Sequence, residues 1–153
     1  MVEVNGIDKE DHVAVPDELT GARLTVQRRL AWAETDAAGH NHFSSAIRWL
    51  EECEHDLWRL LGLTDLVRCV PRVHLEIDYR ERVWFAQGIA VTVGVIHVGR
   101  SSCTFGFTAV TDEGRISSEG RHTVVHTPLA GGGAEPWPDD VRRLLEAPTQ
   151  LHG

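Results

Sequence analysis

The residues best suited to chemistry lie in one short stretch, Glu34 to Ser44, which reads ETDAAGHNHFS. Asp36 supplies a carboxylate at the end of a strand-like run, and an Ala-Ala-Gly turn then leads to His40 and His42. A segment with the pattern of an amphipathic helix begins directly afterwards. The first backbone N–H groups of a helix have no partner within it and lie at the positive end of its dipole, so they can polarise a carbonyl group. A carboxylate beside such donors is suited to acyl transfer.

The elements that must position these residues are predicted from hydrophobic periodicity. Alternating apolar residues predict a strand from Leu24 to about Glu34. Apolar residues at three- and four-residue spacing then predict a helix from Phe43 to Leu61, with Gly62 as its stop. Four further strands are predicted at residues 73–79, 88–98, 102–111 and 115–127, and a short helix at 138–146.

The order of these elements indicates one α+β domain. A chain of 153 residues is ordinarily a single domain. We expect a flexible arm over residues 1–20, a folded domain over 21–128, and a Gly/Pro linker with a short helix over 129–153. One long helix can cover one face of a curved, five-stranded antiparallel sheet. The exposed edges and second face of such a sheet predict a dimer.

Charge and composition exclude several classes of protein. The net charge of −8 argues against a nucleic-acid-binding protein, which needs a basic surface. No apolar run reaches about 18 residues, so no membrane span is expected. The N-terminal sequence MVEVNGIDKEDH is acidic and lacks the apolar core of a signal peptide. The cysteines are three in number and far apart in the sequence, which predicts reduced thiols in the cytoplasm.

Two motifs stand in an order that matches the predicted elements. The first runs from Trp32 to His40 as WAETDAAGH and is followed by IRWLEE at 47–52. The second is VGRSS at 98–102, directly before a predicted strand. Together they resemble the aromatic strand end, T-D-x-x-G turn, helical R-W-x-E pattern and later G-R-S-S segment of hotdog-fold acyl-CoA thioesterases of the 4-hydroxybenzoyl-CoA thioesterase type. The resemblance covers residues 22–127.

This resemblance implies a fold and a reaction centre. The sheet would wrap around the central helix, and two chains would pair into a continuous ten-stranded sheet, as a homodimer or as half of a homotetramer. The active sites would lie at the dimer interface. The catalytic carboxylate maps onto Asp36, and the oxyanion donor maps onto the backbone N–H of Phe43, seven residues later. Asp36 would act as a nucleophile or as a general base, and the sequence leaves both routes open.

The resemblance also implies how the substrate is bound. Gly39 would lie beside the substrate, and Arg100, Ser101 and Ser102 would line the pantetheine channel or hold a phosphate of coenzyme A. A surface hairpin turn is the alternative role of that segment. The substrate would be a thioester of coenzyme A or of a carrier protein, with no cofactor and no metal.

Other roles remain open for the residues of the first motif. Asp36 is also typical of a turn that caps the next helix. His40 and His42 would orient Asp36, bind the substrate, or lie in the pocket or the interface. A zinc site formed by the carboxylates of the motif and these two histidines is a further alternative, since H-x-H is a possible pair of ligands.

Two other functions also remain open. The first is a hotdog dehydratase or cyclase that acts on a carrier-bound polyketide, with His42 as the base. The second is an acyl-binding module without activity. Because another hotdog subgroup carries its catalytic carboxylate on the central helix, Glu51 and Glu52 are reserve candidates, although a solvent-facing pair is the preferred interpretation.

Several side chains are predicted to have structural rather than chemical roles. Cys53 and Cys103 fall on apolar stripes and are expected in the core. The tryptophans at 49, 58 and 84 are expected to be packing residues, and the arginines at 80 and 82 are expected to be surface cations.

Overall fold

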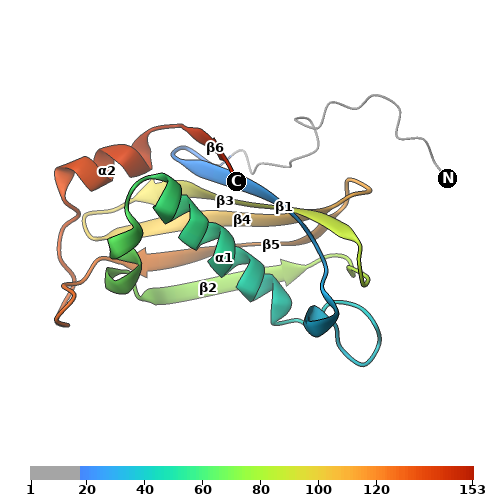
Figure 1. Cartoon of the computed structure of the whole chain (residues 1–153). Helices are drawn as coiled ribbons and strands as arrows, with labels where there is room; N and C mark the ends of the chain where they lie inside the picture. Colours follow the sequence, from blue (N-terminus) through green and yellow to red (C-terminus); the bar gives the residue numbers. More distant parts are fainter. Residues whose placement is uncertain (1–17) are drawn as a thin grey trace.

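The computed structural model describes residues 18–153, so most of the arm predicted over residues 1–20 lies outside the described residues. One long helix lies across one face of a six-stranded sheet (Figure 1). The elements in chain order are β1 (Arg23–Arg29), η1 (Trp32–Glu34), α1 (Ser45–Leu60), η2 (Thr64–Cys69), β2 (Arg72–Tyr79), β3 (Gly88–Val98), β4 (Ser102–Thr111), β5 (Ile116–Val125), α2 (Asp139–Glu146) and β6 (Gln150–His152).

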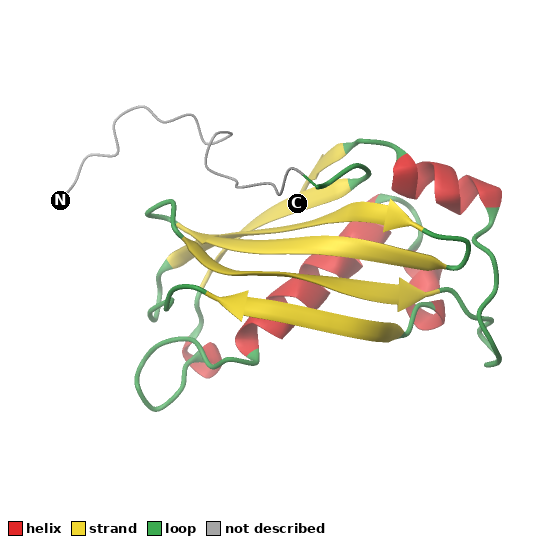
Figure 2. Ribbon diagram, turned by 180° about the vertical axis from the view of Figure 1, so that it is seen from behind, coloured by secondary structure: helices red, strands yellow, loops and turns green. Residues whose placement is uncertain are grey.

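The sheet has the strand order β2-β5-β4-β3-β1-β6. The first five strands in this order pair antiparallel, as predicted, and α1 covers one face of the sheet they form. The other face carries no helix within residues 18–153 (Figure 2). This arrangement confirms the predicted α+β hotdog architecture. No helix in this part of the chain combines the length and the apolar character that crossing a bilayer requires.

The prediction of five strands is one strand short, because β6 pairs in parallel with β1 at the edge of the sheet. β6 has only three residues, too few for an alternating pattern to be visible in the sequence. It reaches β1 because α2 packs against β3 and returns the chain to that edge (Figure 1).

The segment after β5 contributes to the same core as the sheet and α1. Trp137, Val141 and Leu145 are buried with the residues of the central helix. The carbonyl of Leu145 accepts a hydrogen bond from the Ala22 N–H at 3.0 Å, which ties the end of α2 to the start of β1. Residues 137–152 are therefore packed onto the rest of the fold.

The buried face of α1 is rotated relative to the predicted apolar stripe. Three- and four-residue spacing places Phe43, Leu50 and Leu57 on one stripe. Leu50 and Leu57 are buried, together with Trp49 and Trp58, whereas Phe43 is 66% exposed. Phe43 also lies outside α1, which begins at Ser45 and not at residue 43 as predicted. The helix ends before Gly62, whose φ of +76° is the left-handed conformation that suits glycine after a helix.

Cys53 and Cys103 are buried in the core, as predicted. Burial raises the pKa of Cys53 to about 12 and also raises the pKa of Cys103. Because the thiolate is the nucleophilic form of cysteine, neither side chain is suited to nucleophilic chemistry at neutral pH.

Candidate active site

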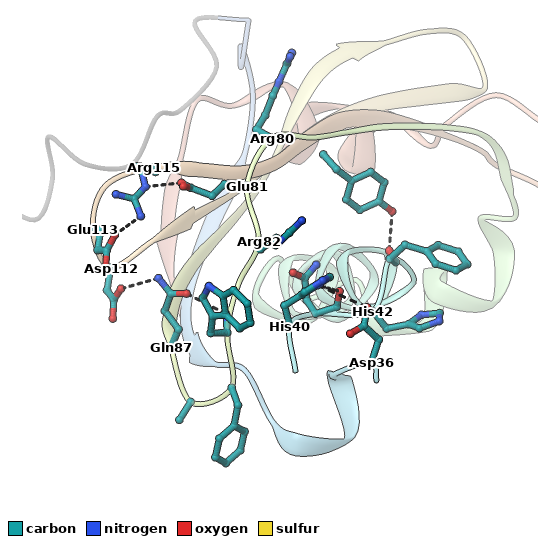
Figure 3. Close-up of a pocket in the computed structure, with 16 residues that line it drawn as sticks. Asp36, His40, His42, Arg80, Glu81, Arg82, Gln87, Asp112, Glu113 and Arg115 are labelled. Atoms are coloured by element: carbon teal, nitrogen blue, oxygen red, sulfur yellow. Dashed lines mark hydrogen bonds and ion pairs between the residues drawn. The ribbon is translucent and has the colours of Figure 1, made fainter. Parts of the chain in front are cut away.

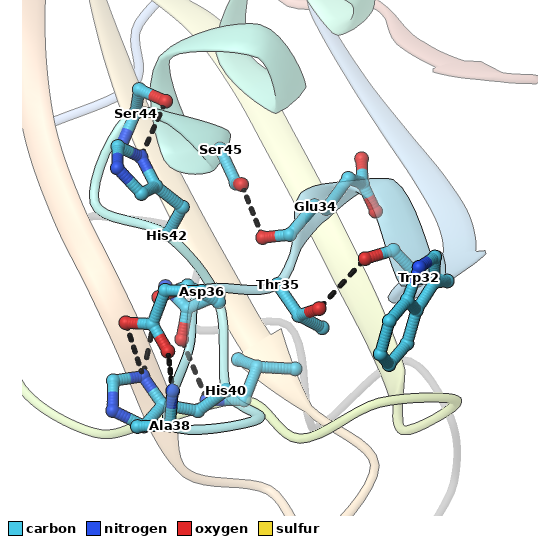
Figure 4. Close-up of polar contacts among 11 residues, drawn as sticks. Trp32, Glu34, Thr35, Asp36, Ala38, His40, His42, Ser44 and Ser45 are labelled. Atoms are coloured by element: carbon cyan, nitrogen blue, oxygen red, sulfur yellow. Dashed lines mark hydrogen bonds and ion pairs between the residues drawn. The ribbon is translucent and has the colours of Figure 1, made fainter.

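The first motif forms a closed loop between β1 and α1 (Figure 4). Thr35 and Asn41 form an isolated antiparallel bridge across the base of the loop. Inside it, the Asp36 N–H donates to the His40 carbonyl at 2.8 Å, and the Gly39 N–H donates to the Asp36 carbonyl at 3.1 Å. Gly39 has a φ of +87°, which a side chain would strain, so the Ala-Ala-Gly turn depends on glycine at this position.

The carboxylate of Asp36 has one oxygen held by the loop and one oxygen near a histidine. Oδ1 accepts the Ala38 N–H at 2.8 Å, which is the turn geometry that the sequence allows for this aspartate. Oδ2 lies 3.6 Å from Nδ1 of His40, and the Asp36 side chain is 30% exposed. The turn contact therefore fixes the direction of the carboxylate while it remains accessible to a ligand.

His40 lies beside Asp36 in the loop. Its Nδ1 is 3.2 Å from the carbonyl of Asn41, and its ring meets the ring of Trp84 edge-on at 5.6 Å. A carbonyl only accepts hydrogen bonds, so Nδ1 is the donor in this contact. His40 is thus oriented by two neighbours and lies close to the carboxylate.

His42 is turned toward the start of α1. Its Nδ1 accepts the Ser44 N–H at 3.2 Å and lies 2.8 Å from the Ser44 hydroxyl. The ring packs against that of Phe43 at a centroid distance of 4.4 Å. His42 therefore satisfies one of the free donors at the helix N-terminus, a structural contact that the sequence did not predict.

The backbone N–H of Phe43 forms no hydrogen bond within residues 18–153, whereas the Phe43 carbonyl accepts the Tyr79 hydroxyl at 2.6 Å. Burial raises the pKa of Tyr79, which keeps this hydroxyl protonated as a donor. Phe43 directly precedes Ser44, the N-cap of α1. An unsatisfied donor thus lies at the positive end of a helix dipole.

A groove of about 1170 Å³ joins these groups (Figure 3). One part of its wall is aromatic, and another part, from the segment after β2 and from the β4–β5 turn, is charged. The lining residues include Asp36, His40, Asn41, His42, Phe43, Tyr79, Arg80, Glu81, Arg82, Trp84, Phe85, Gln87, Asp112, Glu113 and Arg115.

One prediction for the groove wall was wrong, and a second was incomplete. Trp84 is 50% exposed in the groove, so it is not a core packing residue like Trp49 and Trp58. The arginines at 80 and 82 lie on the surface, as predicted, but they also line the groove. The sequence missed this because residues 79–87 reach the first motif only through tertiary contacts, such as the bridge between His40 and Trp84 and the hydrogen bond from the Asn41 N–H to the Val83 carbonyl.

The cations of the groove differ in their partners. Arg115 binds Glu81 at 2.5 Å and also pairs with Glu113, and the hydrogen bond to Glu81 raises its pKa. The hydrogen bond from Arg80 to Glu119, at 2.8 Å, likewise raises the pKa of Arg80. Arg82 forms no ion pair in the described part of the chain.

The structure does not bring Arg100, Ser101 and Ser102 to this groove. They form the β3–β4 turn, at the opposite end of β3 from Gln87. At about 3.3 Å per residue, the eleven residues of β3 separate the two ends by more than 30 Å. The C-terminal segment holds this turn, since the Trp137 N–H donates to the Arg100 carbonyl at 3.0 Å. This turn does not line the groove of its own chain, so its expected substrate-binding role stays a prediction.

The other carboxylates of the motif and of the helix are engaged elsewhere. Glu34, the possible fourth zinc ligand, binds Arg28 and Trp49 and faces away from the groove. No group of three or more His, Cys, Asp or Glu side chains is placed to hold a metal within residues 18–153. Glu51 and Glu52 lie on the exposed face of α1, which is the interpretation that the sequence favoured. They pair there with Arg72 and Arg28, respectively.

A second carboxylate–histidine pair lies in the core, and sequence reasoning missed it. Oε2 of Glu54 lies 2.7 Å from Nε2 of His122, Oε1 accepts the Trp58 indole N–H at 3.0 Å, and Arg72 also binds the carboxylate. Burial favours a higher pKa for Glu54, but His122, Arg72 and Trp58 outweigh it and lower the pKa to about 2. The helical spacing from Leu50 to Glu54 to Trp58 would have indicated a buried position.

Comparison with known proteins places this chain in a described family. A family model described as the thioesterase-like superfamily matches residues 30–145, which include the whole first motif, α1 and the sheet from β2 to β5. A search of curated proteins gives no match.

Several solved structures share the fold. A predicted thioesterase from Bacillus stearothermophilus is 27% identical with a TM-score of 0.75, over 84% of this chain and 98% of its own. A thioesterase from Thermus thermophilus, solved with coenzyme A and zinc, is 18% identical with a TM-score of 0.73, over 80% and 97%. A 1,4-dihydroxy-2-naphthoyl-CoA thioesterase from Synechocystis is 17% identical with a TM-score of 0.71, over 80% and 95%.

Proposed function

Because the chain belongs to the thioesterase-like superfamily, we propose that it is an enzyme that hydrolyses acyl thioesters of coenzyme A. The observation that carries the proposal is that Asp36 and Phe43 line one groove at the N-terminus of α1, and that the Phe43 N–H has no partner within residues 18–153. A thioester needs these two groups together, one to act on its carbon and one to bind its oxygen.

In the proposed reaction, the thioester carbonyl oxygen accepts a hydrogen bond from the Phe43 N–H. Asp36 attacks the carbonyl carbon directly, or it removes a proton from a water molecule that attacks instead. Negative charge then develops on the oxygen, where one such donor contributes about 2.7–4 kcal/mol of transition-state stabilisation. The C–S bond breaks, the thiolate leaves and takes up a proton, and water supplies the hydroxyl group of the released acid.

The nature of the substrate is supported by the relatives and by the groove wall. One relative of the same fold was solved with coenzyme A, and another is described as acting on an aromatic acyl-CoA. Phe43, Tyr79, Trp84 and Phe85 provide an aromatic wall beside Asp36, which suits an apolar or aromatic acyl group. The three cysteines are free thiols, which supports a reducing, cytoplasmic setting for the reaction.

We further propose that the enzyme acts as a homodimer or a dimer of dimers. β2 is an edge strand of the sheet, and it exposes the apolar side chains of Val73, Leu75 and Tyr79. A second copy paired along this strand would cover them and would adjoin the groove, because Tyr79 is part of the groove wall. The partner's β3–β4 turn, with Arg100, Ser101 and Ser102, would then be the source of contacts to coenzyme A. Sedimentation equilibrium measures the mass in solution, and a monomer would contradict this arrangement.

The activity is tested by measuring free-thiol release from aromatic, short-chain and long-chain acyl-CoAs, with the wild type and the Asp36→Asn variant side by side. We expect release from at least one class of substrate and loss of most turnover in the variant. A variant as active as the wild type would contradict the role of Asp36. Absence of release from every acyl-CoA would favour carrier-bound substrates, or the dehydratase or cyclase chemistry of the same fold.

A further inference from the structure

Glu34 lies two residues before Asp36 and has its side chain fully engaged by protein groups. Its Oε1 binds Nη2 of Arg28 at 2.5 Å and accepts the indole N–H of Trp49 at 3.0 Å. Its Oε2 accepts the Ala31 N–H at 2.8 Å. The side chain is only 12% exposed and is not part of the groove lining. The carboxylate therefore joins β1, η1 and α1.

The backbone of Glu34 is bound on its other side, as Figure 4 shows. Its carbonyl accepts the His42 N–H at 2.8 Å and the Ser45 hydroxyl at 2.8 Å. Both donors lie beyond the loop that carries Asp36, and Ser45 is the first residue of α1. One residue thus holds the start of the loop, its end and the first turn of the helix.

These contacts determine where the two proposed reacting groups lie relative to each other. Asp36 is two residues after Glu34, and Phe43 lies between His42 and Ser45, whose donors both bind the Glu34 carbonyl. Trp49, in the second turn of α1, resists rotation of the helix through its bond to the Glu34 side chain. Displacement of a reacting group by about 1 Å lowers rates by about 100-fold, so such an anchor affects catalysis without touching the substrate.

We propose that Glu34 is a positioning residue that sets the geometry between the Asp36 carboxylate and the Phe43 N–H, an inference that rests on the proposed thioesterase function. The anchor requires a carboxylate, because Arg28, Trp49 and Ala31 all donate to it. A glutamine has a single side-chain oxygen and an NH₂ group that cannot accept these donors.

The test compares two variants, each of which removes one of the two carboxylates that bind Arg28. Glu34→Gln changes the residue that holds the loop. Glu52→Gln changes the other partner of Arg28, also at 2.5 Å, whose side chain is 62% exposed and makes no contact with the loop. We expect Glu34→Gln to lower kcat by about 10- to 100-fold with KM changed less than about twofold, because the geometry and not the binding surface is altered. Glu52→Gln should match the wild type.

Amide hydrogen exchange gives a second measurement that does not depend on turnover. The His42 N–H is protected by the Glu34 carbonyl, so it should exchange faster in Glu34→Gln and at the wild-type rate in Glu52→Gln and Asp36→Asn. If Glu34→Gln does not fold, Ser45→Ala replaces it, since this change deletes a single hydrogen bond to the Glu34 carbonyl. Ser45→Ala should lower kcat about threefold to tenfold, again with KM unchanged.

The outcomes separate this inference from the proposed function. A lower kcat with unchanged KM and faster exchange at His42 would support the positioning role. Equal kinetics and equal exchange in Glu34→Gln and Glu52→Gln would overturn it, even if Asp36→Asn is inactive as proposed. If no acyl-CoA is hydrolysed by the wild type, the proposed function fails, and unchanged exchange in Glu34→Gln would still overturn the anchor by itself.

Discussion

Two carboxylate–histidine pairs in the described part of the chain, Asp36 with His40 and Glu54 with His122, lie in opposite environments. Asp36 and His40 belong to one loop, four residues apart, and both are accessible from an open groove. Glu54 and His122 come from α1 and β5, 68 residues apart, and both are buried in the core. The two pairs have similar residue types, but one is accessible to a ligand and the other is not.

The difference lies in how many hydrogen-bonding positions the protein itself fills. Both oxygens of Glu54 are taken by His122, Arg72 and Trp58, and the residue is buried. Asp36 has one oxygen held by Ala38 and the other 3.6 Å from His40, within the groove. A buried carboxylate with both oxygens bound by protein groups has no free position for a ligand, whereas an incompletely paired carboxylate near a free donor can act on one.

Removing the carboxylate of Asp36 from the groove pair, in the Asp36→Asn variant, is expected to have the largest effect, which is on turnover. Loss of a nucleophile or general base should lower kcat by about 100- to 10,000-fold. The melting temperature should stay near that of the wild type, because the amide oxygen of asparagine can still accept the Ala38 N–H. Kinetics and calorimetry on the same preparation check both parts. A large drop in melting temperature would mean that Asp36 is mainly structural.

The Glu54→Gln variant should show the opposite pattern. The glutamine side chain has no charge and only one acceptor oxygen for the donors His122, Arg72 and Trp58, and breaking a buried ion pair in this way typically costs about 3–5 kcal/mol of unfolding free energy. Urea unfolding measures this loss, and kcat at a temperature where the variant is folded should stay close to the wild type.

Glu51→Gln is the matched control for Glu54→Gln, because Glu51 binds the same Arg72 from the exposed face of α1. Its effect on the unfolding free energy should stay within about 0.5 kcal/mol, as for most exposed pairs. Equal losses in the two variants would show that the buried position of Glu54 is not what makes it important.

The dependence of the unfolding free energy on pH gives a further test of the role of Glu54. The pKa of Glu54 is lowered from 4.5 to about 2 in the folded protein, so the folded state binds fewer protons than the unfolded state in this window. Its contribution to stability is complete above pH 4.5 and is lost as the pH falls toward 2. Unfolding free energies measured between these values should fall less steeply in Glu54→Gln than in the wild type. Identical slopes would contradict the lowered pKa.

The smallest effect is expected from Arg100→Ala, at the end of the sheet remote from the groove. If this arginine binds coenzyme A from a paired chain, KM for acyl-CoA should rise several-fold while kcat is retained. Stability should not change, because the turn is held through the backbone carbonyls of Arg100 and Ser102, which the substitution keeps. An unchanged KM would remove Arg100 from the binding surface.

The fold was predictable from the sequence to the extent that its signals are local. The strands at 88–98 and 102–111 were predicted with the bounds that the structure has, because both runs are rich in strand-forming residues and end at local turn signals. The first motif was found because its aspartate, glycine and helix start are contiguous. The short β6 left no such pattern.

The sequence by itself determined the order of the elements, the turn at Gly39 and the position of Asp36 in the loop between a strand and a helix. These depend on backbone conformations and spacings within about ten residues of the chain. Only the tertiary structure decided that Trp84 lines the groove, that His42 binds the helix N-terminus and that Glu54 meets His122. Contacts between strands and the helix depend on how they pack in three dimensions, and residue spacing along the chain does not specify that packing.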